Sequence, residues 1–278
     1  MKVWESLALQ ATTQTGGHGA AEGASGGAPE LPNFITLLYH KFGDTAWAAF
    51  LHHWENIIFS VIIALSLSLL FYLGSRKREP VPSGLQNFLE LVVDSLRNFL
   101  VGVLGHGGEK YVPFLGTLFI YILFMNLFGL IPAMKSPSSS INITAALAMC
   151  VFVTVQYLNI RNMGLFGFIY HMAGSPKTVI GWAVAPLMLP VELITQFARP
   201  LTLALRLFGN IMGEDILIAA FAVLGITILS AVKSPVGIPL QVPFMFLAML
   251  TSLLQALVFT LLSAVYILLA VPHAEEKH

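Results

Sequence analysis

The sequence contains very little charge. Only 10% of its 278 residues are Asp, Glu, Lys or Arg, whereas typical soluble domains have about 25%. Its 14 cations balance its 14 acids, so the formal net charge is zero and no basic excess points to a nucleic-acid partner. Hydrophobic residues make up 56% of the chain. This composition predicts an all-α polytopic membrane protein with lipids as its surroundings.

Cysteine and metal-ligand clusters are also scarce. Cys150 is the one cysteine, so an internal disulfide is excluded, and its apolar neighbourhood predicts a small buried hydrophobe. The pair His52 and His53 stands beside Trp54, but adjacent side chains point apart on a helix. We interpret these residues as lying at the membrane–water interface, and metal binding is the less favoured alternative. No metal or cofactor is therefore expected.

The N-terminal region lacks a long apolar core. Residues 16–30, "GGHGAAEGASGGAPE", are rich in glycine and alanine, which disfavours both a signal peptide and a packed structure. We expect a largely disordered tail over residues 1–50, a membrane domain over residues 51–272 and a short C-terminal tail over residues 273–278.

Long apolar runs are the dominant feature of the remaining chain. A run of about 20 residues is enough to cross a bilayer as a helix. The first run ends in "SRKREP" and the third ends at Arg161, and the positive-inside rule makes both ends cytoplasmic. The N-terminus is then outside, and the C-terminus is cytoplasmic. The predicted membrane-crossing segments are residues 56–74, 111–131, 141–160, 178–229 and 242–271.

The segment between the first two runs has a different pattern. In "PSGLQNFLELVVDSLRNFLVGVLG", residues 82–105, apolar residues recur every three or four positions, which is the period of a helix with one apolar face. We predict an amphipathic helix lying along the cytoplasmic surface of the membrane. A helix packed against a soluble partner is the weaker alternative, because no soluble domain is visible.

The fourth apolar run is too long for an upright helix. At about 1.5 Å per residue, 40 helical residues extend for about 60 Å, twice the hydrocarbon thickness. The run must either break and cross twice or cross once at a steep tilt. One crossing keeps the final tail "PHAEEKH" on the cytoplasmic side, so we predict that the last two helices form a long tilted hairpin.

The same run carries a stripe of polar residues. Glu192, Arg199 and Arg206 are spaced by seven positions, so they share one helical face, and Asn210 joins it one turn later. An arginine at the centre of a bilayer costs about 2.5–3.5 kcal/mol on insertion scales. Ionisable residues that are so costly to place in a bilayer usually mark ion pathways, so Arg206 is a candidate functional residue.

Two acids follow the stripe. Glu214 is next to Asp215, and Asp215 lies nine positions after Arg206, on the opposite side of the helix. One helix thus carries an acid early, a cation in the middle and acids late, which favours two polar pathways separated by a positive charge. The alternative is structural: a Glu192–Arg199 ion pair, with a buried Arg206 satisfied by Gln255.

Three segments resemble subunit a of the membrane sector of F-type ATP synthases: "PVELITQFARPLTLALRLFGNIMGEDIL", "LLQALVFTLLSAVYI" and "SPSSSINITAALA". The resemblance covers most of residues 54–271. It implies a non-catalytic subunit of a bacterial plasma (inner) membrane complex, whose partners are the rotating c-ring, the b subunits of the peripheral stalk and the rest of the synthase. The chain has no GxxxxGK[ST] loop, so ATP chemistry is expected on other subunits.

The resemblance also implies residue roles. Arg206 matches the arginine that faces the c-ring carboxylate and separates two proton half-channels, with Gln255 and Asn210 beside it. Glu192 matches the acid of the cytoplasmic half-channel. The outer half-channel is expected to use Asp215, with Glu214 as the alternative, and a polar residue matched by Asn142.

One position departs from the pattern of many relatives. Ala248 stands seven residues before Gln255, where these relatives have His or Glu facing the outer acid. The outer acids are then expected to act without that partner. A transporter binding an anion at Arg206 would require inverted repeats and broken helices, which the sequence does not show. A purely structural assembly subunit is a third alternative, and the choice between proton and sodium stays open.

Overall fold

The computed structural model describes residues 33–36, 50–51, 53–76, 84–105, 108–131, 134–172, 174, 179–230 and 239–270. Every regular element in these residues is helical, which confirms the all-α prediction. The predicted tails lie almost entirely outside the described residues. The elements are α4 (Glu55–Ser75), α5 (Leu85–Leu104), η1 (Glu109–Tyr111), α6 (Val112–Phe128), η2 (Pro137–Ser139), α7 (Ile141–Met172), α8 (Val179–Ser230) and α9 (Val242–Ala270).

Five of these helices are long and apolar enough to cross a membrane, as the apolar runs predicted. Their bounds agree closely with the prediction except at the end of α7, which continues past Arg161 to Met172. The continuation is possible because Gly164 adopts φ 71°, a left-handed conformation that costs glycine little. The chain therefore kinks at Gly164 and leaves the crossing segment at a new angle.

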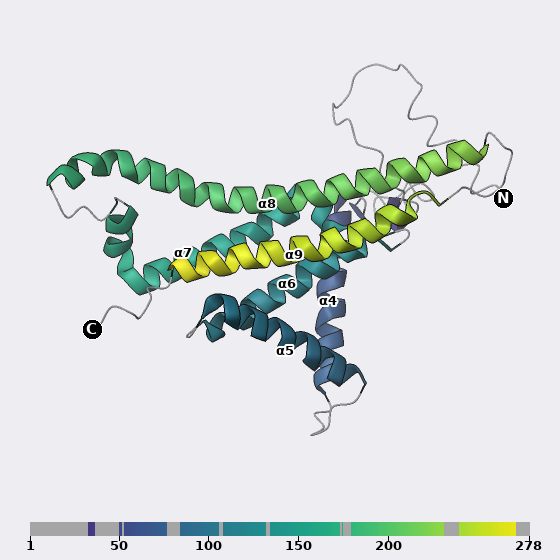
Figure 1. Ribbon diagram of the computed structural model, residues 1–278, viewed down its shortest axis with the longest axis horizontal. Helices are drawn as coiled ribbons and strands as arrows, with labels where there is room; N and C mark the ends of the chain where they lie inside the picture. The colour runs from purple at the N-terminus through teal and green to yellow at the C-terminus, as the bar shows by residue number, and fades with distance from the viewer. Residues whose placement is uncertain are drawn as a thin grey trace, which may run out of the picture.

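Helix α5 is the predicted amphipathic helix, and it packs against α4, α6 and α9 (Figure 1). Its apolar side is only partly covered. Leu89, Leu100 and Leu104 are buried, whereas Phe88 and Leu91 remain exposed. This division shows one packed edge of the helix and one apolar edge that is open to lipid or to another chain.

Helix α8 is a single 52-residue helix, although Pro186, Pro190 and Pro200 lie within it. At about 1.5 Å per residue it extends for about 78 Å. In Figure 1, α8 and α9 run side by side in opposite directions, and both lie across the direction of α4. The long run is therefore one unbroken helix inclined steeply to α4, as a single tilted crossing requires, and the alternative of a break with two crossings does not match the structure.

The core lies where the hairpin rests on α6 and α7. Leu203, Leu207 and Ile211 of α8 are buried in one cluster with Met125 of α6 and Phe259 of α9. Small side chains let α9 approach its neighbours closely, because packing rather than water exclusion drives helix association in lipid. The buried small residues of α9 are Ala248, Ser252, Ala256, Thr260, Ser263, Ala264 and Ala270.

The short helix η2 lies between the main helices and contacts α6, α7 and α8. An ion pair holds the start of this segment, with Lys135 Nζ 2.8 Å from Glu55 Oε1 at the beginning of α4. Asn33 donates a 3.3 Å hydrogen bond to the other carboxylate oxygen of Glu55. Three separate parts of the chain are thus joined at one end of the helical bundle.

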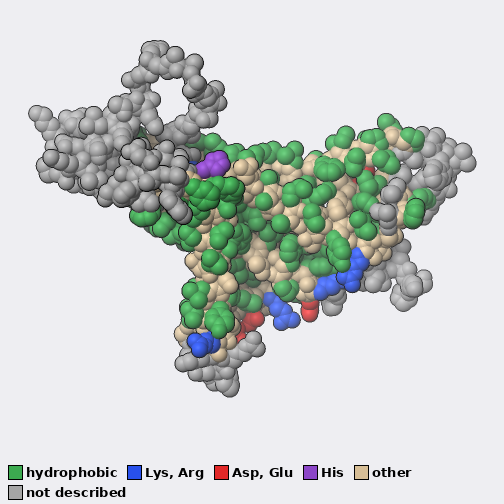
Figure 2. All heavy atoms as spheres, turned by 180° about the vertical axis from the view of Figure 1, so that it is seen from behind, with side chains coloured by type: hydrophobic (Ala, Val, Ile, Leu, Met, Phe, Trp, Pro, Cys, Tyr) green, Lys and Arg blue, Asp and Glu red, His purple; other side chains and the backbone are tan. Residues whose placement is uncertain are grey.

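Most of the remaining surface is apolar. Figure 2 shows hydrophobic side chains over most of one face, with Lys and Arg gathered along its lower edge. Cys150 is exposed, so the prediction of a buried thiol is wrong: α7 turns that side away from the helical bundle. It shares this exposure with many large side chains, among them Val61, Leu65 and Leu69 of α4 and Met149 and Val153 of α7.

Candidate functional site

Arg206 lies near the middle of α8 on its exposed side. The buried neighbours Leu203 and Leu207 hold an adjacent side of this turn in the core. The surface beyond Arg206 is open: a side-chain carbon added at Gly209 or Gly213 would meet no atom within 4 Å. The guanidinium therefore belongs to a face with room for another helix to approach.

A polar contact joins α8 to α9 one turn after Arg206. Asn210 Nδ2 donates a 2.7 Å hydrogen bond to Gln255 Oε1. Gln255 is only 4% exposed, and its Nε2 has no hydrogen-bond partner among the described residues. The sequence placed Asn210 and Gln255 beside the arginine stripe, and the structure brings their side chains into direct contact.

The structural alternative for the stripe does not match this geometry. Arg206 is exposed rather than buried, and Gln255 pairs with Asn210. In the part of the chain that the structure describes, no ion pair joins Glu192 to Arg199. Arg199 instead lies over the ring of Tyr266, with its Cζ 5.5 Å from the ring centroid. The charges of the stripe are therefore not neutralised by one another.

The two later acids are both partly buried on α8. Glu214 lies close to Thr251 of α9, so its carboxyl group is near the interface between the two helices of the hairpin. Ala248 precedes Thr251 by one turn and is 2% exposed. The position that lacks a titratable group in this chain is thus packed inside the protein, on the helix that Glu214 contacts.

Sequence reasoning missed two buried polar residues. Asn126 of α6 donates a 3.4 Å hydrogen bond to the carbonyl oxygen of Ser252, while its Oδ1 has no partner within the described residues. The Ser138 hydroxyl of η2 is fully buried and also lacks a partner there. Asn142, by contrast, is exposed in the first turn of α7. The signal for Asn126 was present, because an amide inside an apolar crossing segment is costly.

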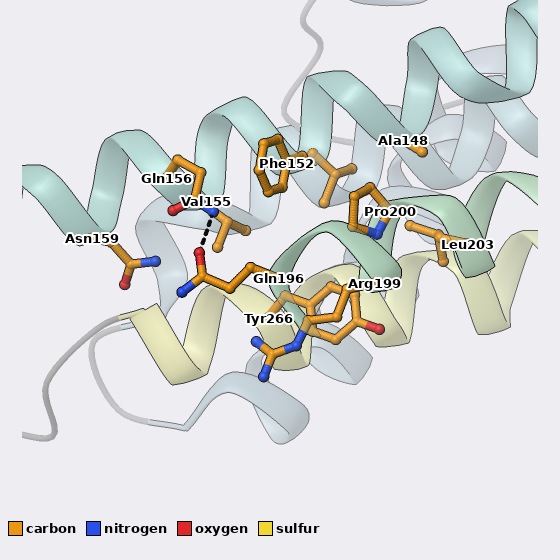
Figure 3. A pocket seen from close by; sticks show the side chains of 11 residues that line it. Ala148, Phe152, Val155, Gln156, Asn159, Gln196, Arg199, Pro200, Leu203 and Tyr266 are labelled. Carbon is orange, nitrogen blue, oxygen red and sulfur yellow. Dashed lines mark hydrogen bonds between the residues drawn. The ribbon is translucent and has the colours of Figure 1, made fainter. Parts of the chain in front are cut away.

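A second set of polar residues lines a cavity between α7, α8 and α9 (Figure 3). Gln156 of α7 and Gln196 of α8 point toward each other and share a 2.7 Å hydrogen bond. Arg199 and Tyr266 line the same cavity. Glu192 is partly buried one turn before Gln196. The polar residues of the hairpin therefore form two groups, one on each side of Arg206 along α8.

Comparison with known proteins identifies the family. The sequence pattern of the family described as "ATP synthase A chain" matches residues 57–268. The ATP synthase subunit a of Protochlamydia amoebophila is 62% identical over 250 residues, which cover 90% of this chain and 92% of the relative. The subunit a of Solidesulfovibrio magneticus is 41% identical, covering 79% and 85%, and that of a Geobacter species is 36% identical, covering 87% and 96%. On this match, and with five apolar helices arranged as described, the chain belongs to the ATP synthase subunit a family.

Proposed function

We propose that this protein is the stationary proton-translocating subunit of a bacterial F-type ATP synthase. It would form two half-channels against a rotating c-ring, without carrying out ATP chemistry itself. The observation that supports this role most strongly is the setting of Arg206: a single cation on an open apolar face of a steeply inclined helix. Such a face suits an approaching membrane helix that carries a negative charge.

The physical basis of the proposed mechanism is the cost of charge in lipid. A carboxyl group on the ring can pass through hydrocarbon only when it is neutral, because an unpaired carboxylate there is prohibitively costly. Each ring carboxylate would take a proton from the outer half-channel, travel around the membrane and release the proton into the inner half-channel. One charge moved across 100 mV supplies about 2.3 kcal/mol, so several protons must contribute to each ATP.

Arg206 would have two tasks in this cycle. Its guanidinium attracts the ionised ring carboxylate as that group passes between the half-channels. It also blocks a direct leak, because an arginine side chain keeps its proton in proteins and cannot relay one. The Asn210–Gln255 hydrogen bond fixes the adjacent surface of the hairpin, so the approaching ring helix meets a defined wall.

The outer half-channel would use the polar groups beyond Arg206. Glu214 and Asp215 are its candidate proton acceptors, and we add Asn126 and Ser138, whose unpartnered buried oxygens offer hydrogen-bonding positions to water. Asn142 would lie nearer the outer surface. These groups come from α6, η2, α7 and α8, so the route would run through the helical bundle.

The inner half-channel would begin at Glu192, on the other side of Arg206. This assignment places the N-terminus outside, the C-terminus in the cytoplasm and the chain in the plasma (inner) membrane. The apolar surfaces of α4 and α5 that no described helix covers would be available to lipid and to the b subunits of the peripheral stalk.

The decisive variant is Arg206→Ala in the whole complex. Because the separating charge is lost, we expect ATP-driven proton pumping and ATP synthesis to fall at least a hundredfold, while the complex still assembles. Leu205→Ala is the control, since Leu205 is an exposed neighbour in the same turn of α8. Pumping is measured in inverted vesicles and assembly by affinity purification. Normal coupled synthesis in Arg206→Ala would refute the proposed role.

A further inference from the structure

The cavity between α7, α8 and α9 has a volume of about 40 Å³. Its lining is unusually polar for a site inside a membrane-crossing bundle, with Gln156, Asn159, Gln196 and Arg199 among apolar residues such as Phe152. Figure 3 shows the two glutamine side chains meeting across it and Asn159 at one end. Polar side chains that face one another in this way need partners for all their hydrogen-bonding atoms.

One side-chain acceptor at the cavity lacks a protein partner, and one backbone acceptor beside it lacks its usual helical donor. Gln156 gives its amide hydrogen to Gln196, which leaves Gln156 Oε1 buried with no donor among the described residues. Pro200 lines the cavity and has no N–H group, so the backbone carbonyl of Gln196, four residues earlier, loses its normal helical donor. A water molecule is the donor that can reach such groups when protein atoms do not.

Arg199 adds unused donors to the same cavity. Its guanidinium carries five N–H donors, and its contact with the face of the Tyr266 ring does not use those donors. Within the described ranges, no carboxylate lies at ion-pair distance from Arg199. The cavity thus presents donors and acceptors together, which is the combination that binds ordered water.

The cavity is large enough to hold ordered water. A buried water occupies about 10–15 Å³ of cavity volume of this kind and needs two to four polar partners. The cavity therefore has room for more than one water, and its polar lining supplies the partners.

The polar lining also continues toward one end of the bundle. Gln156, Asn159 and Asn162 recur every three residues on α7, so they follow one side of that helix. Asn162 donates a 3.1 Å hydrogen bond to the carbonyl of Ala270, the last residue of α9. Arg161 is exposed beside it, at the end that the positive-inside rule makes cytoplasmic. A line of polar groups therefore connects the cavity with the inner surface.

We propose that this cavity holds ordered water and forms a hydrated internal branch of the inner half-channel, located between α7, α8 and α9 rather than on the ring-facing surface. The branch leads from the Arg161 end of α7 to the turn of α8 that carries Glu192 and Gln196. This inference rests on the proposed function for its role in proton release, whereas the presence of water rests on the cavity alone.

The first test is the access of Ag⁺ to engineered thiols. Ag⁺ reacts with thiolates, and a thiolate forms only where the sulfur contacts water. In the whole complex on a Cys150→Ala background, we expect Ag⁺ added from the cytoplasmic side to slow proton pumping more than tenfold in Gln156→Cys and Gln196→Cys. Leu158→Cys is the matched control, because Leu158 is buried on α7 but does not line the cavity. It should change less than twofold.

A second measurement uses the wild-type complex and needs no substitution. X-ray radiolysis of water oxidises side chains next to bound water, so Phe152 and Tyr266 in the wild-type complex should be oxidised. Phe259, which is fully buried in the core, is the control and should not be. Oxidation is measured by mass spectrometry of peptides.

The outcomes separate this inference from the proposed function. Coupled synthesis in Arg206→Ala would refute the proposed function whatever the cavity contains. The hydrated branch is overturned if Arg206→Ala is uncoupled but the two cavity positions respond to Ag⁺ no more than Leu158→Cys, with Phe152 unoxidised. Reaction from the outer side alone would also overturn it, because the cavity would then open to the opposite surface.

Discussion

At the scale of single residues, what a charged side chain can do depends on the atoms that surround it. Arg206 and Arg199 are seven positions apart on one helix, yet Arg206 is exposed on the open face and Arg199 is stacked on Tyr266 beside a cavity. In the free chain, Arg206 would face lipid, which is costly for a guanidinium. An ionised carboxylate on a partner helix would relieve that cost, so the proposed function explains why the charge is there.

The variant Arg206→Lys tests whether any cation is sufficient. We expect pumping to fall at least tenfold, because a desolvated lysine can lose its proton and lacks the planar guanidinium. A passive proton leak should rise as well, since a neutral amine can relay protons. ATP-driven pumping and passive leak are both measured in inverted vesicles. Wild-type values for both would show that a positive charge alone performs the task.

The outer acids give a second test at this scale. Glu214→Gln and Asp215→Asn each remove a proton acceptor while keeping the side-chain shape, so each should slow proton flux. We expect the double variant to be slowest, at least tenfold below wild type. Flux is measured in vesicles at a fixed membrane potential. If the double variant conducts as well as wild type, the outer pathway does not pass this part of α8.

The departure at Ala248 allows a rescue experiment. Adding Ala248→His to Asp215→Asn should restore part of the flux, because imidazole titrates near neutral pH. Ala248 is buried, so the larger side chain has to displace its neighbours, and Ala248→Gln serves as a control of similar size without a titratable group. Rescue by both substitutions would indicate a packing effect, and rescue by histidine alone supports a relay at this position.

At the scale of elements, the turn between α6 and α7 is packed against the main helices and also offers a position for testing the membrane orientation. Lys135 is held by Glu55, and Ser138 within η2 is buried against the main helices. Only part of the turn faces outward, with Met134 37% exposed. The turn is therefore a fixed structural part, and one residue in it is suitable for labelling.

Thiol labelling tests the predicted orientation of these elements. On a Cys150→Ala background, a membrane-impermeant maleimide should label Met134→Cys only from outside. It should label Arg76→Cys, at the exposed end of α4, only from the cytoplasmic side. Labelling is compared in intact cells and in inverted vesicles, with detergent-solubilised protein as the measure of full reactivity. The reverse pattern would exchange the two proposed half-channels.

At the scale of the whole molecule, the inclination of α8 and α9 is the central feature. An upright helix would need only about 20 residues to cross, whereas α8 has 52. The extra length lets one helix carry one polar group on each side of Arg206. In the proposed arrangement neither route crosses the membrane by itself, because the ring completes the path.

Reconstitution tests this property of the assembly. Vesicles containing this chain alone should conduct protons at close to the background rate, because Arg206 separates the two routes. Addition of the c-ring and stalk subunits should raise the flux at least tenfold above that background. Arg206→Ala protein in the same vesicles is the control for leakage through the chain. A high flux from the wild-type chain alone would favour an independent transporter.

The crossing segments were predictable because their signals are local. A helix in lipid must satisfy its own backbone, so a long apolar run is enough to indicate it. The stripe of Glu192, Arg199 and Arg206 followed from helical periodicity in the same way. Family resemblance then pointed to Gln255, about 50 residues later in the chain, whose contact with Asn210 the structure supplies.

Other features depend on which surfaces meet, and no local pattern contains that information. The sequence by itself determined the number of helices, the length that forces α8 to tilt and the order of its charges, because composition and period act along one segment. Only the tertiary structure decided that Cys150 is exposed, that Asn126 and Ser138 are buried with unpartnered oxygens, and that a polar cavity lies beside Pro200. The physical reason is that burial and hydrogen bonding are set by the packing of helices distant in the chain, and in lipid this packing depends on close contact rather than on hydrophobicity.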